Sequence, residues 1–213
     1  MTEPTDFDTT AVDKTAVDKR ALLASRLRRR IADTDHPLSY PQQRLWFLDQ
    51  LDPGNPVYVV PLTYRVDGPL SVPALETALT GLVHRHHVLR TVFRSVDDMP
   101  RQFVQPAGPV TVPIQDVSAQ DDPAAAAEAL SREEAHRPFD LATDPMIRPL
   151  LLRLAPEEHR LYLTMHHIAC DGASLGILGA ELSQLYRAGR SARFGSSPAS
   201  AARYSCESSA LAG

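Results

Sequence analysis

Residues 165–172 (MHHIACDG) hold the densest group of chemically versatile side chains in the sequence. This stretch follows an apolar run and precedes a leucine-periodic run, so we expect it between a strand and a helix, where polar side chains can reach a cleft. Successive residues of a strand point to opposite faces, and His166 and His167 therefore cannot both face that cleft. We expect one imidazole to face outward for chemistry and the other to face inward for structure.

A histidine at the end of a strand can act as a general base, because its ordinary pKa of about 6.5 lies close to neutral pH. The alternative is that both histidines have structural roles only. Asp171 and Gly172 predict a turn in which Gly172 is free to adopt a positive φ and Asp171 caps the following helix. Adjacent histidines on a strand diverge, and no further cluster of metal-ligating residues lies close by, so we expect no metal site.

Two other segments combine polar and apolar residues in ways that could serve a site. Residues 85–93 (RHHVLRTVF) join the end of a predicted helix to the start of a predicted strand. Cationic side chains at a helix C-terminus complement the helix dipole, which is a sufficient structural role for Arg85. Residues 38–48 (LSYPQQRLWFL) predict the start of a core-packing helix, with Ser39 as the cap and Pro41 in the first turn.

The surrounding sequence alternates between strand-like and helix-like segments. Apolar and β-branched runs predict strands at 57–67, 91–96, 101–105, 110–117, 147–154 and 161–167. Capping signals and apolar periodicity predict helices that begin near residues 39, 71 and 172. The alanine-rich residues 123–136 predict a further helix from propensity alone, with Pro123 suited to its first turn. This interleaving predicts an α/β fold. The short connections at 97–100 and 155–160 favour hairpins, and hence a mixed, largely antiparallel sheet with packed helices.

Composition sets outer limits on the possible functions. The 213 residues are 43% hydrophobic and 23% charged, which fits one ordinary domain or one lobe of a larger protein. A net charge of −4 argues against a nucleic-acid partner held by bulk electrostatics. The sequence has neither a run of 18 apolar residues nor a secretory signal, so we expect no membrane association. Two cysteines, Cys170 and Cys206, make neither a disulfide framework nor a zinc site, so we expect a reducing cytoplasm.

The chain divides into four parts by composition. Residues 1–18 are acidic and polar and predict a disordered leader. Residues 19–36 predict an amphipathic helix and linker, because Leu23, Leu27 and Ile31 recur on one face of an otherwise basic segment. Residues 37–190 predict the folded domain. Residues 191–213, rich in Ser, Ala and Gly, predict a disordered tail where the coding sequence was cut or read out of frame.

The three clusters together carry a family resemblance. In this order and at these separations, LSYPQQRLWFL, RHHVLRTVF and MHHIACDGAS resemble the condensation domains of nonribosomal peptide synthetases, over residues 38–190. The resemblance implies a chloramphenicol-acetyltransferase-like two-layer sandwich, of which this chain holds only the N-terminal lobe. It implies amide formation between aminoacyl thioesters held on the phosphopantetheine arms of carrier proteins, with no cofactor bound directly by the domain.

The resemblance also implies roles for individual residues. His167 matches the motif histidine that orients or deprotonates the attacking amine, and Gly172 matches a glycine whose backbone N–H approaches the thioester oxygen as negative charge develops. These two positions are the expected catalytic ones. Structural roles at the active site fall to four other motif residues: His166, Asp171, Arg85 and Arg90. We expect Asp171 to pair with one of the two arginines.

The sequence departs from the family pattern in places. His87 stands where a glutamate is usual, Cys170 replaces a common serine and Ala173 replaces a common bulky residue. Nothing in residues 191–213 resembles the second lobe of the family, so we expect a surface of this lobe to bind a missing second lobe or another copy of the chain. Two alternatives stay open: a non-catalytic remnant or docking piece that binds a synthetase, and a coenzyme-A-dependent acyltransferase that shares sites between subunits.

Overall fold

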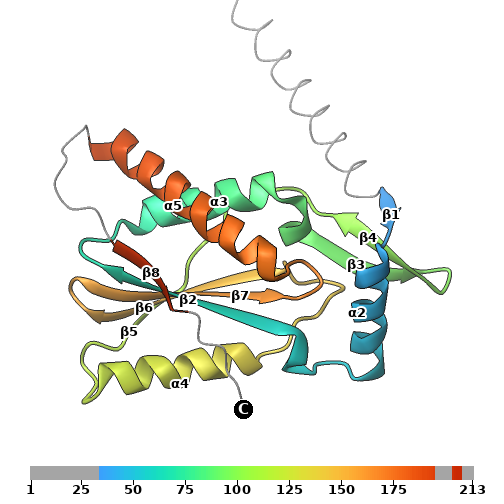
Figure 1. Cartoon of the computed structure of the whole chain (residues 1–213), viewed down its shortest axis with the longest axis horizontal. Coiled ribbons are helices and arrows are strands. Elements are labelled where there is room, and N and C mark those ends of the chain that lie inside the picture. The colour runs from blue at the N-terminus through green and yellow to red at the C-terminus, as the bar shows by residue number, and fades with distance from the viewer. Residues whose placement is uncertain (1–33, 195–202, 208–213) are drawn as a thin grey trace, which may run out of the picture.

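The computed structural model describes residues 34–194 and 203–207, with side chains described for residues 34–190. The expected leader at 1–18 and residues 19–33 of the expected amphipathic helix and linker (19–36) lie outside the described residues. Figure 1 shows one central sheet with helices packed on it and a small second sheet at one end of the molecule. The described part of the chain is α/β, with four α-helices, as the sequence predicts.

The central sheet has five strands in the order β5-β6-β7-β2-β8. Its middle is an antiparallel hairpin of β6 (Ile147–Ala155) and β7 (Glu158–His166). Strand β2 (Val59–Asp67) lies antiparallel to β7, and β5 (Ile114–Asp116) lies parallel to β6. The sheet is therefore mixed and mainly antiparallel. In its register Val59 lies opposite His166, so β2 begins beside the first histidine of the predicted site.

The second sheet has three strands in the order β1-β4-β3. Strands β3 (Thr91–Val96) and β4 (Met99–Val104) form the predicted hairpin, and β1 (Asp35–Pro37) pairs with the outer side of β4. Asp97 and Asp98 connect the hairpin with φ angles of 50° and 61°. Two consecutive left-handed residues match the right-handed twist of the flanking strands, and aspartate is among the residues that tolerate this conformation.

Each described helix starts at a capping signal in the sequence. Helices α2 (Tyr40–Leu51), α3 (Val72–Arg85) and α4 (Pro123–His136) all have proline in the first turn. Their cap side chains accept hydrogen bonds from backbone N–H groups that the first turn leaves without helical partners. Helix α5 (Gly172–Phe194) follows β7 through the turn that holds the predicted site. Two short 3₁₀ turns, η1 (Pro56–Tyr58) and η2 (His87–Arg90), precede β2 and β3.

The core forms on both faces of the central sheet. Leu161, Leu163 and Met165 of β7 are buried on the face that packs against α3 and α5. Tyr162, which points to the opposite face, lies with Leu150 in a smaller cluster against α4. The alternation of side chains along β7 thus supplies apolar contacts to both helical layers. None of the helices in the described segments is long and apolar enough to cross a membrane.

The C-terminal part differs from the expected disordered tail. Helix α5 continues to Phe194, beyond the expected domain end at residue 190. Residues 203–207 form β8 (Arg203–Glu207), which pairs antiparallel with β2 from Thr63 to Asp67. The composition of this segment did not predict β8, because the strand has no periodic apolar pattern of its own. It forms instead by backbone pairing with the free edge of β2.

Candidate active site

His166, the last residue of β7, is buried with 3% of its surface exposed. Its ring lies edge-on to the rings of Tyr58 and Phe139, with centroids 6.3 Å and 5.9 Å away. The backbone N–H of Ile168 donates to its Nδ1 over 3.1 Å. Burial, and to a lesser degree the neighbouring His167, lowers the pKa of His166 to about 4. The ring is therefore neutral at pH 7, and it accepts a hydrogen bond from the turn that follows.

His167 is exposed, on the other side of the strand end. Its backbone N–H donates to the carbonyl oxygen of Tyr58 over 2.9 Å, which fixes the main chain. Its Nδ1 lies 2.7 Å from the carbonyl oxygen of Cys170. A carbonyl oxygen only accepts, so Nδ1 carries the proton and Nε2 of the neutral ring carries the lone pair. Within the described residues Nε2 has no hydrogen-bond partner, so it is available to accept a proton.

Asp171 closes the turn and begins the helix. Its Oδ1 accepts hydrogen bonds from both the backbone N–H, over 2.8 Å, and the hydroxyl of Ser174. These bonds hold the pKa of Asp171 below its ordinary value, with the hydroxyl as the largest cause. A negative charge at a helix N-terminus also interacts favourably with the helix dipole. Asp171 therefore caps α5, as its sequence position predicts.

The expected pairing of Asp171 with Arg85 or Arg90 is wrong for this structure: no ion pair joins Asp171 to an arginine within the described residues. Nη1 of Arg85 instead lies 3.4 Å from Oε1 of Glu181 in α5. Arg90 donates to the carbonyl oxygens of Val83 and Gln105 and lines a separate cavity. The reason is local, since backbone carbonyls at the end of α3 and β4 occupy Arg90 and the cap occupies Asp171.

Gly172 is the first residue of α5 and does not have the positive φ that the turn pattern predicts. The described glycines with positive φ are Gly54 and Gly68. A Cβ added at Gly172 would meet nothing within 4 Å, so the space in front of this residue is open. Its N–H belongs to the first helical turn and has no partner among the described residues, which leaves it free to donate to a developing negative charge.

Cys170 contributes packing and a backbone acceptor. It is a free, buried cysteine whose Sγ lies 3.5 Å from the carbonyl oxygen of His166. Burial, with a smaller contribution from Asp171, raises the pKa of its thiol to about 12. A thiol in this state is a poor nucleophile, because the thiolate is the reactive form. No group of three or more metal-ligating side chains occurs in the part of the chain that the structure describes.

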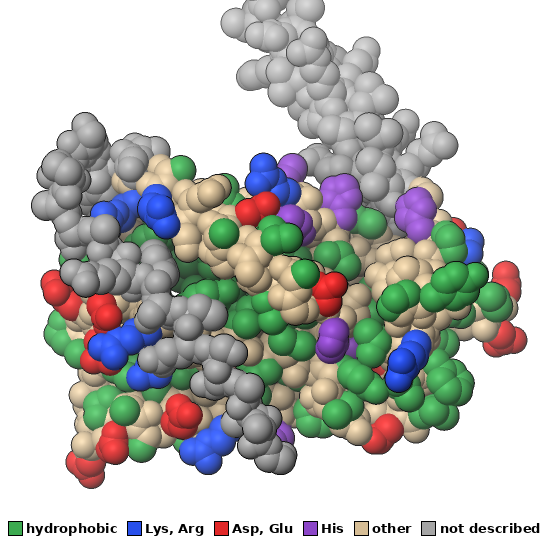
Figure 2. All heavy atoms as spheres, in the orientation of Figure 1, with side chains coloured by type: hydrophobic (Ala, Val, Ile, Leu, Met, Phe, Trp, Pro, Cys, Tyr) green, Lys and Arg blue, Asp and Glu red, His purple; other side chains and the backbone are tan. Residues whose placement is uncertain are grey.

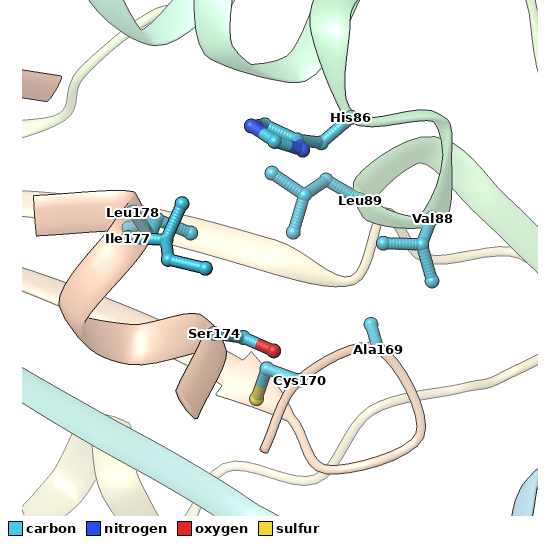
Figure 3. A pocket seen from close by; sticks show the side chains of 8 residues that line it. All are labelled: His86, Val88, Leu89, Ala169, Cys170, Ser174, Ile177 and Leu178. Carbon is cyan, nitrogen blue, oxygen red and sulfur yellow. The ribbon is translucent and has the colours of Figure 1, made fainter. Parts of the chain in front are cut away.

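Two of the three sequence clusters meet at one cavity of about 150 Å³ (Figure 3). Its walls come from the start of η2 on one side and from the turn and first helical residues of α5 on the other: His86, Val88, Leu89, Ala169, Cys170, Ser174, Ile177 and Leu178. His167 does not line the cavity, but Ala169 and Cys170, two and three residues further along the turn, do.

Sequence reasoning missed the groups that fix the histidines in place. Glu181 accepts from His86 Nε2 at 2.7 Å and so ties α5 to the end of α3. Phe139 contacts the ring of His166, and the guanidinium of Arg148 stacks on Phe139 with 3.8 Å between its Cζ and the ring centroid. Phe139 lies outside any regular element. One sequence signal pointed to Glu181: it lies on the predicted helix that begins at the turn of the site.

Comparisons with known proteins agree on one family. The sequence profile of the condensation domain matches residues 32–207. The chain is 44% identical to phosphinothricin tripeptide synthetase PhsC of Streptomyces viridochromogenes, over 79% of this chain and 17% of that protein. It is 44% identical to the isonitrile lipopeptide synthase of Mycobacterium tuberculosis, over 70% of this chain and 6% of that protein. The chain thus spans a small part of each of these relatives.

Solved structures give the same result. The starter condensation domain of rhizomide synthetase RzmA superimposes with a TM-score of 0.69 at 31% identity, covering 73% of this chain and 39% of that one. The first condensation domain of the calcium-dependent antibiotic synthetase, in complex with a substrate analogue, gives 0.70 at 28% identity, covering 79% and 40%. Together with the profile match, this likeness in fold shows that the chain belongs to the condensation domain family.

Proposed function

We propose that the chain is the N-terminal lobe of an amide-forming condensation domain and that His167 acts on the attacking amine. The observation that carries this proposal is the exposed ring of His167, whose Nδ1–H is held by the Cys170 carbonyl and whose Nε2 is open. In the proposed step an amine nitrogen attacks a thioester carbonyl carbon. Nε2 takes the proton from that nitrogen, the C–S bond breaks, and the proton passes to the leaving thiolate.

Gly172 and the remaining motif residues have supporting roles in this proposal. The N–H of Gly172 donates to the carbonyl oxygen as negative charge develops there. His166 and Asp171 act structurally: His166 fixes the turn from the buried side, and Asp171 caps α5. Both substrates arrive on phosphopantetheine arms of carrier protein domains, and the lobe itself holds no cofactor. We propose the cytoplasm as the location of such a complex.

A second lobe completes the cleft in this proposal. Helix α2 has no buried residue, and its Tyr40, Phe47 and Leu51 are exposed. Figure 2 shows hydrophobic side chains gathered on the part of the surface that α2 forms. Apolar side chains that gather on a surface are typical of surfaces that bind another protein. The proposed reaction needs both walls of the cleft, one from each lobe, because the two reactants must be held together between them.

The test is reconstitution. The chain is mixed with a separately produced C-terminal lobe of a related condensation domain and with two loaded carrier proteins, and dipeptidyl thioester is measured by mass spectrometry. We expect product with the unchanged chain and loss of product with His167→Ala. His136→Ala is the matched control, because His136 is also exposed and its Nδ1 also contacts a backbone carbonyl, at the far end of α4. Unchanged product with His167→Ala would contradict the catalytic role.

A non-catalytic docking piece is the second candidate. In this candidate the chain binds a synthetase without turnover, and the exposed Tyr40, Phe47 and Leu51 of α2 supply apolar surface for such binding. Capture of carrier protein by the chain, with no amide under any complementation, would support this candidate over the first.

A further inference from the structure

The cavity between η2 and the start of α5 is not used by the proposed proton transfer, although it is joined to the proposed base. The carbonyl of Cys170 accepts from His167 Nδ1, while the side chain of Cys170 lines the cavity. Figure 3 shows the ring of His86 and the side chain of Leu89 on one side, facing Cys170 and Ser174 on the other. A group in this cavity therefore contacts Cys170, the residue whose carbonyl orients the proposed base.

The polar side chains of the cavity wall already have partners within the chain. His86 Nε2 lies 2.7 Å from Glu181, which leaves Nδ1 as its one uncommitted nitrogen. The hydroxyl of Ser174 is held by Asp171, and the thiol of Cys170 lies against the carbonyl of His166. A ligand with charges or several hydrogen-bonding groups would lose its hydration here and find few partners. The remaining walls are aliphatic side chains, which favour an apolar occupant.

The volume limits the size of that occupant. The cavity measures about 150 Å³. An engineered, dry cavity of about this volume in another protein binds benzene, so a group of up to roughly six carbons fits. Ile177, at the mouth, is 57% exposed, so the cavity opens to solvent and can be entered from outside. A small branched aliphatic group matches both the size and the chemistry of the walls.

We propose that this cavity binds the small apolar side chain of a carrier-bound aminoacyl group and selects it by size and polarity. The inference rests on the proposed function, because the substrate class follows from amide formation between aminoacyl thioesters. The apolar side chain belongs either to the donor or to the acceptor thioester, and the experiment separates these sources. Filling the cavity removes selectivity and leaves His167 in place.

The binding test adds three thioesters of N-acetylcysteamine, one at a time, to the chain. The methyl NMR signals of Ile177 and Leu178 report binding. Isovaleryl thioester should shift these signals with a dissociation constant at least tenfold below that of acetyl thioester, because each buried methylene contributes about fourfold. Succinyl thioester, which carries a carboxylate, should leave the signals unchanged. Equal affinity for isovaleryl and acetyl thioesters, or shifts confined to other residues, would overturn the proposal.

Two filling variants and one control locate the effect. Val88→Phe and Ile177→Phe place a larger side chain in the cavity, and we expect each to weaken isovaleryl binding at least tenfold and acetyl binding by less than twofold. Ile177→Phe keeps the test valid if Val88→Phe fails to fold, because position 177 is largely exposed. Ile114→Phe is the matched control on β5, where the isoleucine is also exposed and lies outside the cavity.

The reconstituted two-lobe reaction then distinguishes the failure of this inference from the failure of the proposed function. We expect Ile177→Phe to lower the preference for leucine over glycine at least tenfold when the residue is varied on one carrier and not on the other, which identifies donor or acceptor. Amide formation with unchanged preference on both carriers would overturn the cavity proposal and leave the function standing. Methyl shifts without amide formation would overturn the function and leave the cavity standing.

Discussion

The Nδ1 of His167 lies 2.7 Å from the carbonyl oxygen of Cys170, three residues further along the same turn. The main chain of the turn therefore selects the tautomer that leaves Nε2 unprotonated. Many histidine bases are oriented by a carboxylate, and for the proposed base His167 a backbone carbonyl serves that purpose. The orientation thus depends on the turn itself, which is fixed by His166 and capped by Asp171.

Removing the imidazole of His167 should lower the rate of amide formation without lowering stability. General bases contribute about 100-fold to 10,000-fold to a rate, so we expect kcat of the reconstituted enzyme to fall within that range for His167→Ala. The side chain is exposed, and thermal unfolding should stay unchanged. Calorimetry and a single-turnover assay check both halves of this prediction, with His136→Ala as the control. A large drop in melting temperature would instead indicate a structural role.

The neutral, buried His166 should make stability depend on pH. The pKa of His166 is lowered from 6.5 to about 4 in the folded chain. The stabilising contribution of the neutral ring to the unfolding free energy is therefore fully present above pH 6.5. As the pH falls from 6.5 toward 4, the unfolded state binds the proton first, and up to about 3 kcal/mol of unfolding free energy is lost. Urea unfolding at several pH values should show this loss, reduced in His166→Asn and unaltered in His136→Asn. The pKa of buried His159 is also lowered, so it contributes in the same direction to all three chains.

Two glycines of α5 should respond in opposite ways to alanine. Gly172→Ala adds a Cβ with nothing within 4 Å, so the unfolding free energy should stay unchanged or rise by up to about 1 kcal/mol. Gly179→Ala places its Cβ 2.9 Å from the hydroxyl of Tyr64, which is buried, and should lower stability by about 1 to 2 kcal/mol. Chemical denaturation measures both, and adding Tyr64→Phe to Gly179→Ala should recover part of the loss.

Breaking the ion pair of Glu134 and Arg148 should destabilise the chain. Arg148 Nε lies 2.9 Å from Glu134 Oε1, and both side chains are largely buried. Arg148→Met leaves Oε1 of the buried Glu134 carboxylate without its partner, while Oε2 keeps its ion pair with Arg137. The change also removes the hydrogen bonds of Arg148 to the carbonyls of Pro138 and Arg137. We expect a loss of about 3 kcal/mol. The double variant Arg148→Met with Glu134→Gln should be more stable than Arg148→Met alone. A double-mutant cycle by denaturation measures this coupling, and additivity of the two single changes would contradict it.

The sequence was sufficient for the four helices, for the two hairpins and for the contrast between the two histidines, but not for β1 and β8. The predicted caps Ser39 and Ser71 mark the starts of α2 and α3, because each cap replaces a hydrogen bond that the first helical turn lacks. The start of α4 follows from alanine propensity and Pro123, and its cap Asp122 is seen only in the structure. The alternation of a strand separates His166 from His167 by geometry alone. These are local rules, and they hold here because the core packs without conflict with them.

The parts that sequence reasoning missed depend on contacts between distant residues. Arg90 had charge and position suited to Asp171, but the carbonyls of Val83 and Gln105 compete for it in the folded chain. Asp171-Gly172 is typical of a turn with positive φ, yet the chain enters α5 directly at Gly172. The cavity has walls from segments about 80 residues apart along the chain, His86 and Cys170 among them, and no local pattern contains its shape or volume.

The pairing of β8 with β2 has a practical consequence for protein engineering. A shortened version that stops before residue 203 would bare the backbone groups of β2 from Thr63 to Asp67. Unpaired strand edges of this kind pair with strands of neighbouring molecules and promote precipitation. Affinity tags, fluorescent fusions or grafted lobes are therefore best attached after residue 207, and purification yield of the two lengths would show the difference directly.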